Sequence, residues 1–196
     1  IDDAPSGLGW LPDGRLLVVA MASRRVLRVE PDGAVVTHAE LASVAGGSCN
    51  DMVVAADGTA YVGNFGYDFT AGETRRAAAL ARIAPDGTVA VAAEELEFPN
   101  GTVITPDGST LIVAETFGKR LTAFDIAPDG SLANRRIHAD LAGAHPDGIC
   151  LDANGAVWVA DPYGKRVLRV LDGGAVTDVI GFGDEMPVAC VLGGEG

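Results

Sequence analysis

The chain has 196 residues, 48% hydrophobic and 21% charged, which is enough apolar material for a sizeable core and excludes wholesale disorder. Lys and Arg total 14 against 27 Asp and Glu, and the resulting net charge of −13 makes nucleic acid and anionic membrane surfaces poor partners. Metal cations and neutral or cationic small molecules are better candidate ligands for an acidic protein. The alternative is that the acidic surface only keeps the protein soluble.

The 26 Gly and 10 Pro are spread along the chain, which indicates many short strands rather than a linker. Apolar runs such as residues 16–22 are too short to cross a bilayer, and the chain begins without a signal sequence. Three widely spaced cysteines (Cys49, Cys150 and Cys190) predict buried thiols rather than a disulfide framework. We therefore expect a cytoplasmic protein with no membrane partner.

Four segments of the chain repeat one pattern, in which an apolar run, an Asp-Gly or Asn-Gly turn and a second apolar run follow one another. The turns begin at Asp13, Asp57, Asp107 and Asn154, with spacings of 44, 50 and 47 residues. A second set of turns lies between them, at residues 31–33, 85–87, 128–130 and 172–173. Such dipeptides between apolar runs predict hairpins, here with type I′ turns, so each unit is expected to contain four strands.

Four strands in each 40–50 residues is the period of a β-propeller blade. The sequence predicts an all-β chain with four complete blades between residues 6 and 180 and the start of a fifth near Pro187. Residues 69–82 are expected to form an inserted loop in the second blade. We expect one partial propeller domain over residues 1–196, open at its blade edges and therefore able to self-associate. A β-sandwich built from the same hairpins is the alternative.

One polar residue stands seven positions before each of the first turns, where the first strand of each blade should begin. These residues are Ser6, Asn50, Asn100 and Asp147. Asn and Asp are poor strand formers, and oxygen ligands gathered at the mouth of a propeller would suit a hard cation such as Ca²⁺. The alternative is that Pro-Asn-Gly, Pro-Asp-Gly and Asn-Asp simply form further turns.

Residues 98–115 and 145–161, together with Cys-Asn-Asp-Met at 49–52, resemble the regucalcin/gluconolactonase family. The resemblance implies a six-bladed propeller that hydrolyses sugar or related lactones with one divalent metal, Ca²⁺ first and Zn²⁺, Mg²⁺ or Mn²⁺ as alternatives. It also implies that Asn100 and Asp147 are metal ligands, that Asp147 is the candidate catalytic base, and that Asn50 binds the substrate.

The sequence departs from the family pattern at two places. The family's third protein ligand is the Glu of a Glu-Gly-Pro motif one blade before Ser6, and this chain has no such motif. Ser48 stands where some members have Arg. The chain thus resembles blades two to five of six, and the competing hypothesis is a non-catalytic binding module or an inactive fragment. Outside the site, we expect Trp10 and Trp158 in the core, and Glu115 and Asp161 at solvated strand ends.

Overall fold

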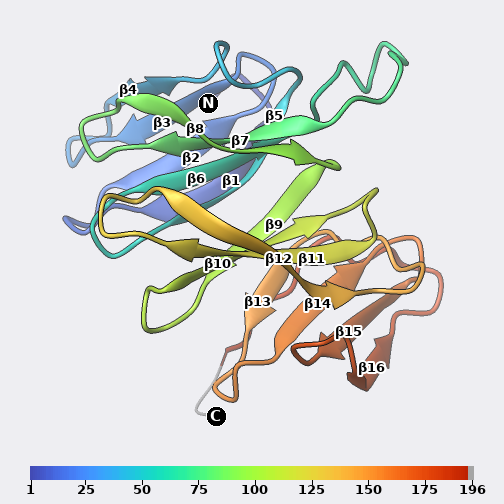
Figure 1. Cartoon of the computed structure of the whole chain (residues 1–196). Coiled ribbons are helices and arrows are strands. Elements are labelled where there is room, and N and C mark those ends of the chain that lie inside the picture. The colour runs from blue at the N-terminus through green and yellow to red at the C-terminus, as the bar shows by residue number, and fades with distance from the viewer. Residues whose placement is uncertain (194–196) are drawn as a thin grey trace. The chain divides into compact units, whose positions relative to one another are not determined.

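A computed structural model of the chain describes residues 1–193, which contain sixteen strands and no helix. The strands form four antiparallel sheets of four, each built from consecutive strands, as predicted (Figure 1). The chain divides into two compact units, one formed by Ile1–Pro99 with Pro128–Ser131 and the other by Asn100–Ala127 with the residues from Leu132 onward. A single domain over residues 1–196 stays a prediction.

The first unit holds two sheets that share a core. Its buried residues include Leu17, Val26, Leu41, Val62 and Ile83. The first sheet contains β1 (Pro5–Trp10), β2 (Leu16–Ala20), β3 (Arg25–Val29) and β4 (Val35–Glu40), and the second contains β5 (Cys49–Val54), β6 (Ala60–Asn64), β7 (Ala78–Ile83) and β8 (Val89–Leu96).

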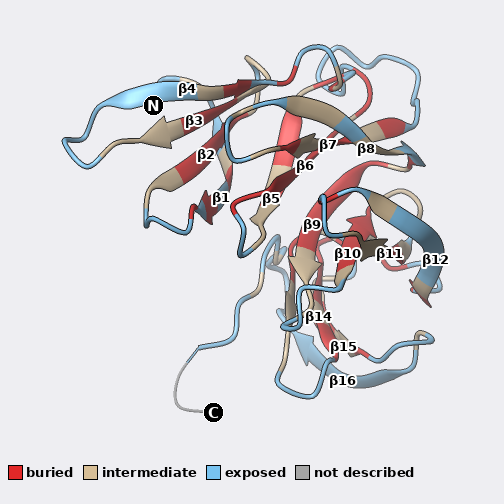
Figure 2. Ribbon diagram, turned by 60° about the vertical axis from the view of Figure 1, so that its left-hand side comes forward, coloured by how far each residue is buried: buried red, intermediate tan, exposed pale blue. Residues whose placement is uncertain are grey.

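The second unit repeats the arrangement around its own core. Its buried residues include Ile112, Leu121, Leu141, Val159 and Leu168. One sheet contains β9 (Pro99–Ile104), β10 (Thr110–Glu115), β11 (Arg120–Ile126) and β12 (Leu132–Asp140), and the other contains β13 (Ile149–Leu151), β14 (Val157–Asp161), β15 (Arg166–Val170) and β16 (Val176–Gly181). In each sheet the second strand is largely buried, while the fourth strand is largely exposed in β4, β12 and β16 and mostly half-buried in β8 (Figure 2).

The predicted hairpins are confirmed, but the type I′ assignment is wrong. At the first turn only Gly14 has a positive φ, 85°, and Asp13 does not. Gly14 N donates to Leu11 O at 2.9 Å, while Asp13 Oδ1 accepts the backbone N–H of Arg15 at 3.1 Å. This is a three-residue loop that ends in a left-handed glycine, and it needs a positive φ at one position rather than two.

Other expectations need correction. Residues 78–82 belong to β7, so the inserted loop covers residues 65–77 instead of 69–82. Trp10 is 60% exposed and lies outside the core, because it points away from the buried face of β1. Beyond β16, the described residues contain no further strand, although Val188 O accepts Gly148 N at 2.9 Å where a fifth unit was expected to begin. The described part of the chain also contains no helix able to span a membrane.

All three cysteines are free thiols. Cys49 is buried, as expected, and desolvation raises its pKa to about 12. Cys150 and Cys190 are only half-buried, and their Sγ atoms lie 3.8 Å apart.

Glu115, expected at a solvated strand end, is fully buried. Its carboxylate accepts hydrogen bonds from Arg120 Nε at 2.9 Å and Arg120 Nη2 at 2.8 Å, from Arg135 at 3.4 Å, and from the hydroxyl of Thr122. Asp161, at the equivalent end of β14, is also buried and accepts Arg166 Nε at 2.9 Å. These carboxylates are therefore structural ion-pair partners between the second and third strands of their sheets.

We predict that Glu115→Ala destabilises the chain by about 2–3 kcal/mol, because Arg120, Arg135 and Thr122 lose the hydrogen bonds that they donate to this buried carboxylate. The measurement is urea unfolding. Asp125→Ala is the matched control, since it removes an exposed carboxylate that pairs with Arg136 in the same sheet; it should change stability little. Equal effects of the two substitutions would contradict the structural role of Glu115.

Two histidines occupy equivalent β-bulges on fourth strands. His38 is skipped in the pairing of β3 with β4, and His138 in the pairing of β11 with β12. The Nε2 atom of each is buried without a hydrogen-bond partner. Desolvation lowers the pKa of both histidines. At His38 the nearby Arg28 and Arg15 lower the pKa further, and Asp86 opposes them. At His138 the pKa is lowered further by Arg136 and raised by Asp172.

We predict that stability falls as the pH drops below about 6.5, the pKa of an unfolded histidine, because the unfolded chain then binds protons that the folded one does not. Stability continues to fall until the pH reaches the pKa values of the folded histidines. For each histidine, the unfolding equilibrium constant rises at most about tenfold per pH unit. Urea midpoints between pH 7.5 and 5.0 measure it. His38→Gln with His138→Gln should flatten the profile, and an unchanged slope would rule out these groups.

Candidate functional site

The second unit brings together the two residues predicted to bind metal. Asn100 lies on β9 and Asp147 lies two residues before β13, and Gly101 N donates to Asp147 O at 3.2 Å. A Cβ at position 101 would stand 2.4 Å from that same oxygen, so only glycine permits this approach. Gly101 has no positive φ, and therefore the Asn-Gly pair serves close strand packing rather than a turn.

Asn100 is held by a short chain of hydrogen bonds. Its side chain is buried, with Nδ2 donating to Thr116 Oγ1 at 3.2 Å, and Thr116 Oγ1 donates in turn to Pro146 O at 2.7 Å. Because the hydroxyl proton of Thr116 is used on Pro146, this hydroxyl must accept from Asn100, which fixes the amide orientation. The Oδ1 atom of Asn100 is then left buried without a hydrogen-bond partner.

The segment before Asp147 is fixed from a second side. Asp161 Oδ1 accepts the backbone N–H of His145 at 3.0 Å and that of Gly164 at 3.2 Å. Asp147 N donates to Ala160 O at 2.9 Å. The half-buried Asp147 carboxylate therefore projects from a backbone segment that is anchored on both sides.

The first unit holds the other two residues of the predicted set, Ser6 and Asn50. A Cβ at Gly7 would lie 2.5 Å from Met52 N and 2.9 Å from Asp51 Cα, so β1 and β5 meet as closely as their counterparts in the second unit. Asn50 is 8% exposed and belongs to β5, not to a turn.

Asp51 and Thr116 were not identified from the sequence as site residues. Asp51 follows Asn50 at a bulge in the pairing of β5 with β6, and desolvation raises the pKa of its carboxyl group. A carboxyl group with a raised pKa is a better proton acceptor once ionised. The Asn-Asp dipeptide is a signal for Asp51 in retrospect, whereas nothing in the local sequence distinguishes Thr116.

The donor chemistry of Asn100 and Asp147 suits a hard cation, because an amide oxygen without a partner and a carboxylate are oxygen ligands. The set is incomplete by itself, since Ca²⁺ takes six to eight oxygens. Among residues 1–193 no group of three His, Cys, Asp or Glu side chains could hold a metal ion. The two residues therefore fit as part of a ligand set that needs water, substrate or further protein oxygens.

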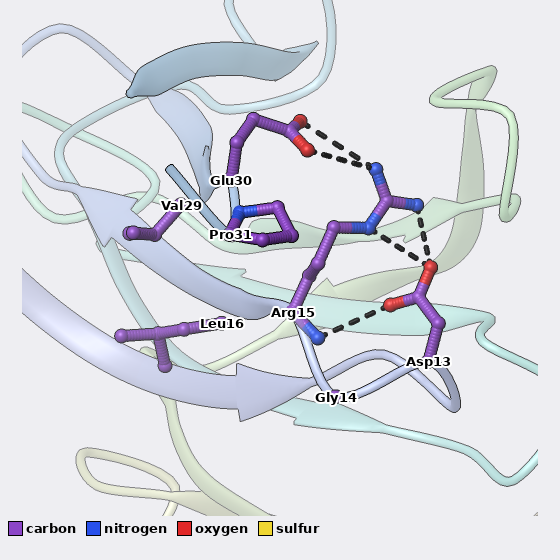
Figure 3. Close-up of a pocket in the computed structure, with 7 residues that line it drawn as sticks. All are labelled: Asp13, Gly14, Arg15, Leu16, Val29, Glu30 and Pro31. Carbon is purple, nitrogen blue, oxygen red and sulfur yellow. Dashed lines mark hydrogen bonds and ion pairs between the residues drawn. The ribbon is translucent and has the colours of Figure 1, made fainter. Parts of the chain in front are cut away.

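Two of the hollows in the first unit differ in character. One, of about 260 Å³, is lined by Arg24, Gly46, Gly47, Ser48 and Asp68, and so lies beside the backbone that leads into Asn50. The other, of about 280 Å³, lies at the hairpin turns of the first sheet (Figure 3). There Arg15 forms ion pairs with Asp13 Oδ2 at 2.7 Å and with Glu30 at 3.3 Å. These ion pairs join the two hairpin turns, so the charge of Arg15 is already neutralised within the protein.

Comparison with known proteins agrees with the resemblance seen in the sequence. The family model for the SMP-30/gluconolactonase/LRE-like region matches residues 2–196. L-arabinolactonase from Azospirillum brasilense is 32% identical over 99 residues, which cover 50% of this chain and 33% of that protein. 6-Deoxy-6-sulfogluconolactonase from Pseudomonas putida is 29% identical over 124 residues, 62% of this chain and 43% of that protein.

Among solved structures, a calcium-binding protein, regucalcin from Agrobacterium tumefaciens, superposes with a TM-score of 0.80 at 22% identity. The match covers 96% of this chain and 64% of that one. This likeness confirms the predicted β-propeller class with four-stranded blades. The aligned part of the chain spans less than half the length of the two lactonases.

We predict that Thr116→Val destabilises the chain by about 2 kcal/mol, because Asn100 Nδ2 and Pro146 O lose a partner that they share in a buried place. Thermal or urea unfolding measures the loss. Thr116→Ser keeps the hydroxyl and should retain most of the stability. If the Val and Ser variants prove equally stable, the hydrogen-bond chain does not hold Asn100.

Proposed function

Because the chain belongs to the SMP-30/gluconolactonase/LRE-like family, we propose that this protein hydrolyses lactones to hydroxy acids. The observation that carries the proposal is Asn100 Oδ1, a buried acceptor with fixed orientation and no partner. The next residue, Gly101, donates its backbone N–H to Asp147 O. A buried polar atom without a partner costs about 1–3 kcal/mol, and a bound ligand would repay that cost.

In this proposal, Asn100 and Asp147 hold a divalent cation, Ca²⁺ in the first instance and Zn²⁺, Mg²⁺ or Mn²⁺ as alternatives. When bound, such a cation supplies Lewis-acid polarisation of the lactone carbonyl and stabilises the oxyanion. Regucalcin, one of the structural neighbours, is a calcium-binding protein by name, which supports the choice of cation.

The chain's own residues supply orientation and proton transfer. Asn50 binds the lactone through its amide, and Asp147 accepts a proton from the attacking water. The water oxygen bonds to the acyl carbon, the ring C–O bond breaks, and the released alkoxide takes up a proton to give the hydroxy acid.

A non-catalytic binding module is the competing hypothesis. It is favoured by the small ligand set, since no group of three His, Cys, Asp or Glu side chains occurs among residues 1–193. A cytoplasmic location and self-association through open blade edges also stay predictions, and a small neutral lactone remains the proposed partner.

We predict that Ca²⁺ binds saturably in calorimetry and that Asp147→Asn weakens this binding at least tenfold, because a charged oxygen ligand is lost. Asp178→Asn is the matched control, since it removes an exposed carboxylate of β16 in the same unit and should leave binding unchanged.

Hydrolysis of L-arabinono- and D-gluconolactones and of alkyl-substituted δ-lactones is then followed by acid release. Activity that Asp147→Asn reduces more than a hundredfold supports the enzyme. Calcium binding without hydrolysis of any lactone would favour the binding module. Equal binding by wild type and Asp147→Asn would refute the assigned ligand.

A further inference from the structure

Four aromatic rings gather in the first unit, and the proposed reaction uses none of them. We call Phe65, Tyr67, Phe69 and Phe98 the aromatic cluster. Phe65 and Phe98 stack with centroids 4.3 Å apart and planes inclined by 12°. The ring of Phe69 meets both edge-on at 6.0 Å, and Tyr67 lies 6.4 Å from Phe69 and from Phe98.

The cluster lies at the end of its sheet that also carries Asn50. Cys49, which precedes Asn50, pairs with Asn64, the residue just before Phe65. Phe65 N donates to Ser48 O at 3.0 Å. Leu96, two residues before Phe98, pairs with Ala78 at the end of the loop. The loop over residues 65–77 therefore leaves the sheet at the end where β5 starts (Figure 1).

The loop is held in one conformation by its own polar groups. Asp68 Oδ1 accepts Thr70 Oγ1 at 2.7 Å and Ala71 N at 2.9 Å, and Asp68 N donates to Glu73 at 3.0 Å. At its base, a Cβ on Gly47 would lie 2.2 Å from Tyr67 O, so the segment before β5 packs directly on the loop. The rings are thus presented by an ordered support.

Two features of the cluster are not explained by packing. Phe69 keeps 49% of its surface exposed, although Tyr67 and Phe98 beside it are only 4% and 9% exposed. Phe98 adopts a φ of 65°, a left-handed conformation that is unfavourable for a bulky side chain. An ordered loop that exposes an aromatic face, next to a strained aromatic residue, is typical of a ligand site.

We propose that the aromatic cluster is an apolar subsite for the substituent of a lactone ring. It makes the protein selective for lactones with an alkyl or aryl chain over polyhydroxylated sugar lactones. This rests on the proposed function and names its substrate class. Asp68 and Glu73 on the loop are balanced by Arg75 and Arg76, and Arg76 pairs with Glu73 at 2.8 Å, so the loop has no net charge. The exposed, uncharged face of Phe69 therefore favours an apolar substituent.

Binding of lactams tests the subsite separately from hydrolysis, because the proposed reaction does not open them. The probes are unsubstituted δ-valerolactam and the same ring with a hexyl chain on the carbon beside nitrogen. In NMR titrations we expect the hexyl lactam to bind wild type about tenfold more tightly, since the chain covers the exposed ring face. Phe69→Ala should reduce this preference to less than twofold, and Phe69→Leu should keep part of it.

Phe182→Ala is the matched control, because Phe182 is 42% exposed in the second unit and should leave the preference unchanged. A preference that survives Phe69→Ala, or its absence in wild type, would overturn the subsite. Tighter binding of tetramethylammonium than of the hexyl lactam would also overturn it and indicate a cation site. If no lactone is hydrolysed but the preference for the hexyl lactam depends on Phe69, the proposed hydrolysis is wrong and the proposed subsite is supported.

Discussion

The close approach of first strands in neighbouring sheets is the constraint on which the rest of the structure depends. Gly7 faces the backbone at Asp51 and Met52, and Gly101 faces Asp147 O, in each case at a distance that leaves no room for a side chain. In the second unit the residue just before that glycine is Asn100. A glycine that closes the gap between two sheets thus also fixes the place of the polar residue that precedes it.

Buried polar groups then fix orientation where packing alone would not. Thr116 joins Asn100 on β9 to Pro146 in the segment before β13, and Asp161 holds the same segment through the backbone of His145. Because the Thr116 hydroxyl accepts from Nδ2 of Asn100, the Oδ1 of Asn100 points elsewhere and is buried without a hydrogen-bond partner. The Glu115 carboxylate has a structural role for a similar reason, because it accepts hydrogen bonds from Arg120 and Arg135.

The two halves of the proposed chemistry have different physical sources. The proposed oxygen ligands lie at the start of β9 and in the segment just before β13, at positions that repeat from sheet to sheet. The aromatic cluster comes from the loop over residues 65–77, which interrupts the repeat and brings its own hydrogen-bond network. A repeated scaffold with one inserted loop can thus keep a common reaction while it changes the substituent that is accepted.

The sequence by itself determined the all-β class, the four four-stranded sheets and the polar residues at the starts of β1, β5 and β9, because turn spacing and alternation are local signals. Asp147, expected to open a strand as well, lies two residues before β13. The predictions for Glu115 and Trp10 were wrong, because the burial of a side chain depends on the residues that pack against it in the fold. The predicted boundary between the loop and β7 was also wrong. Only the tertiary structure showed that Thr116 orients Asn100 and that Phe65, Phe69 and Phe98 meet. Those contacts join residues 16 to 33 positions apart or lie within an irregular loop, and no periodicity encodes them.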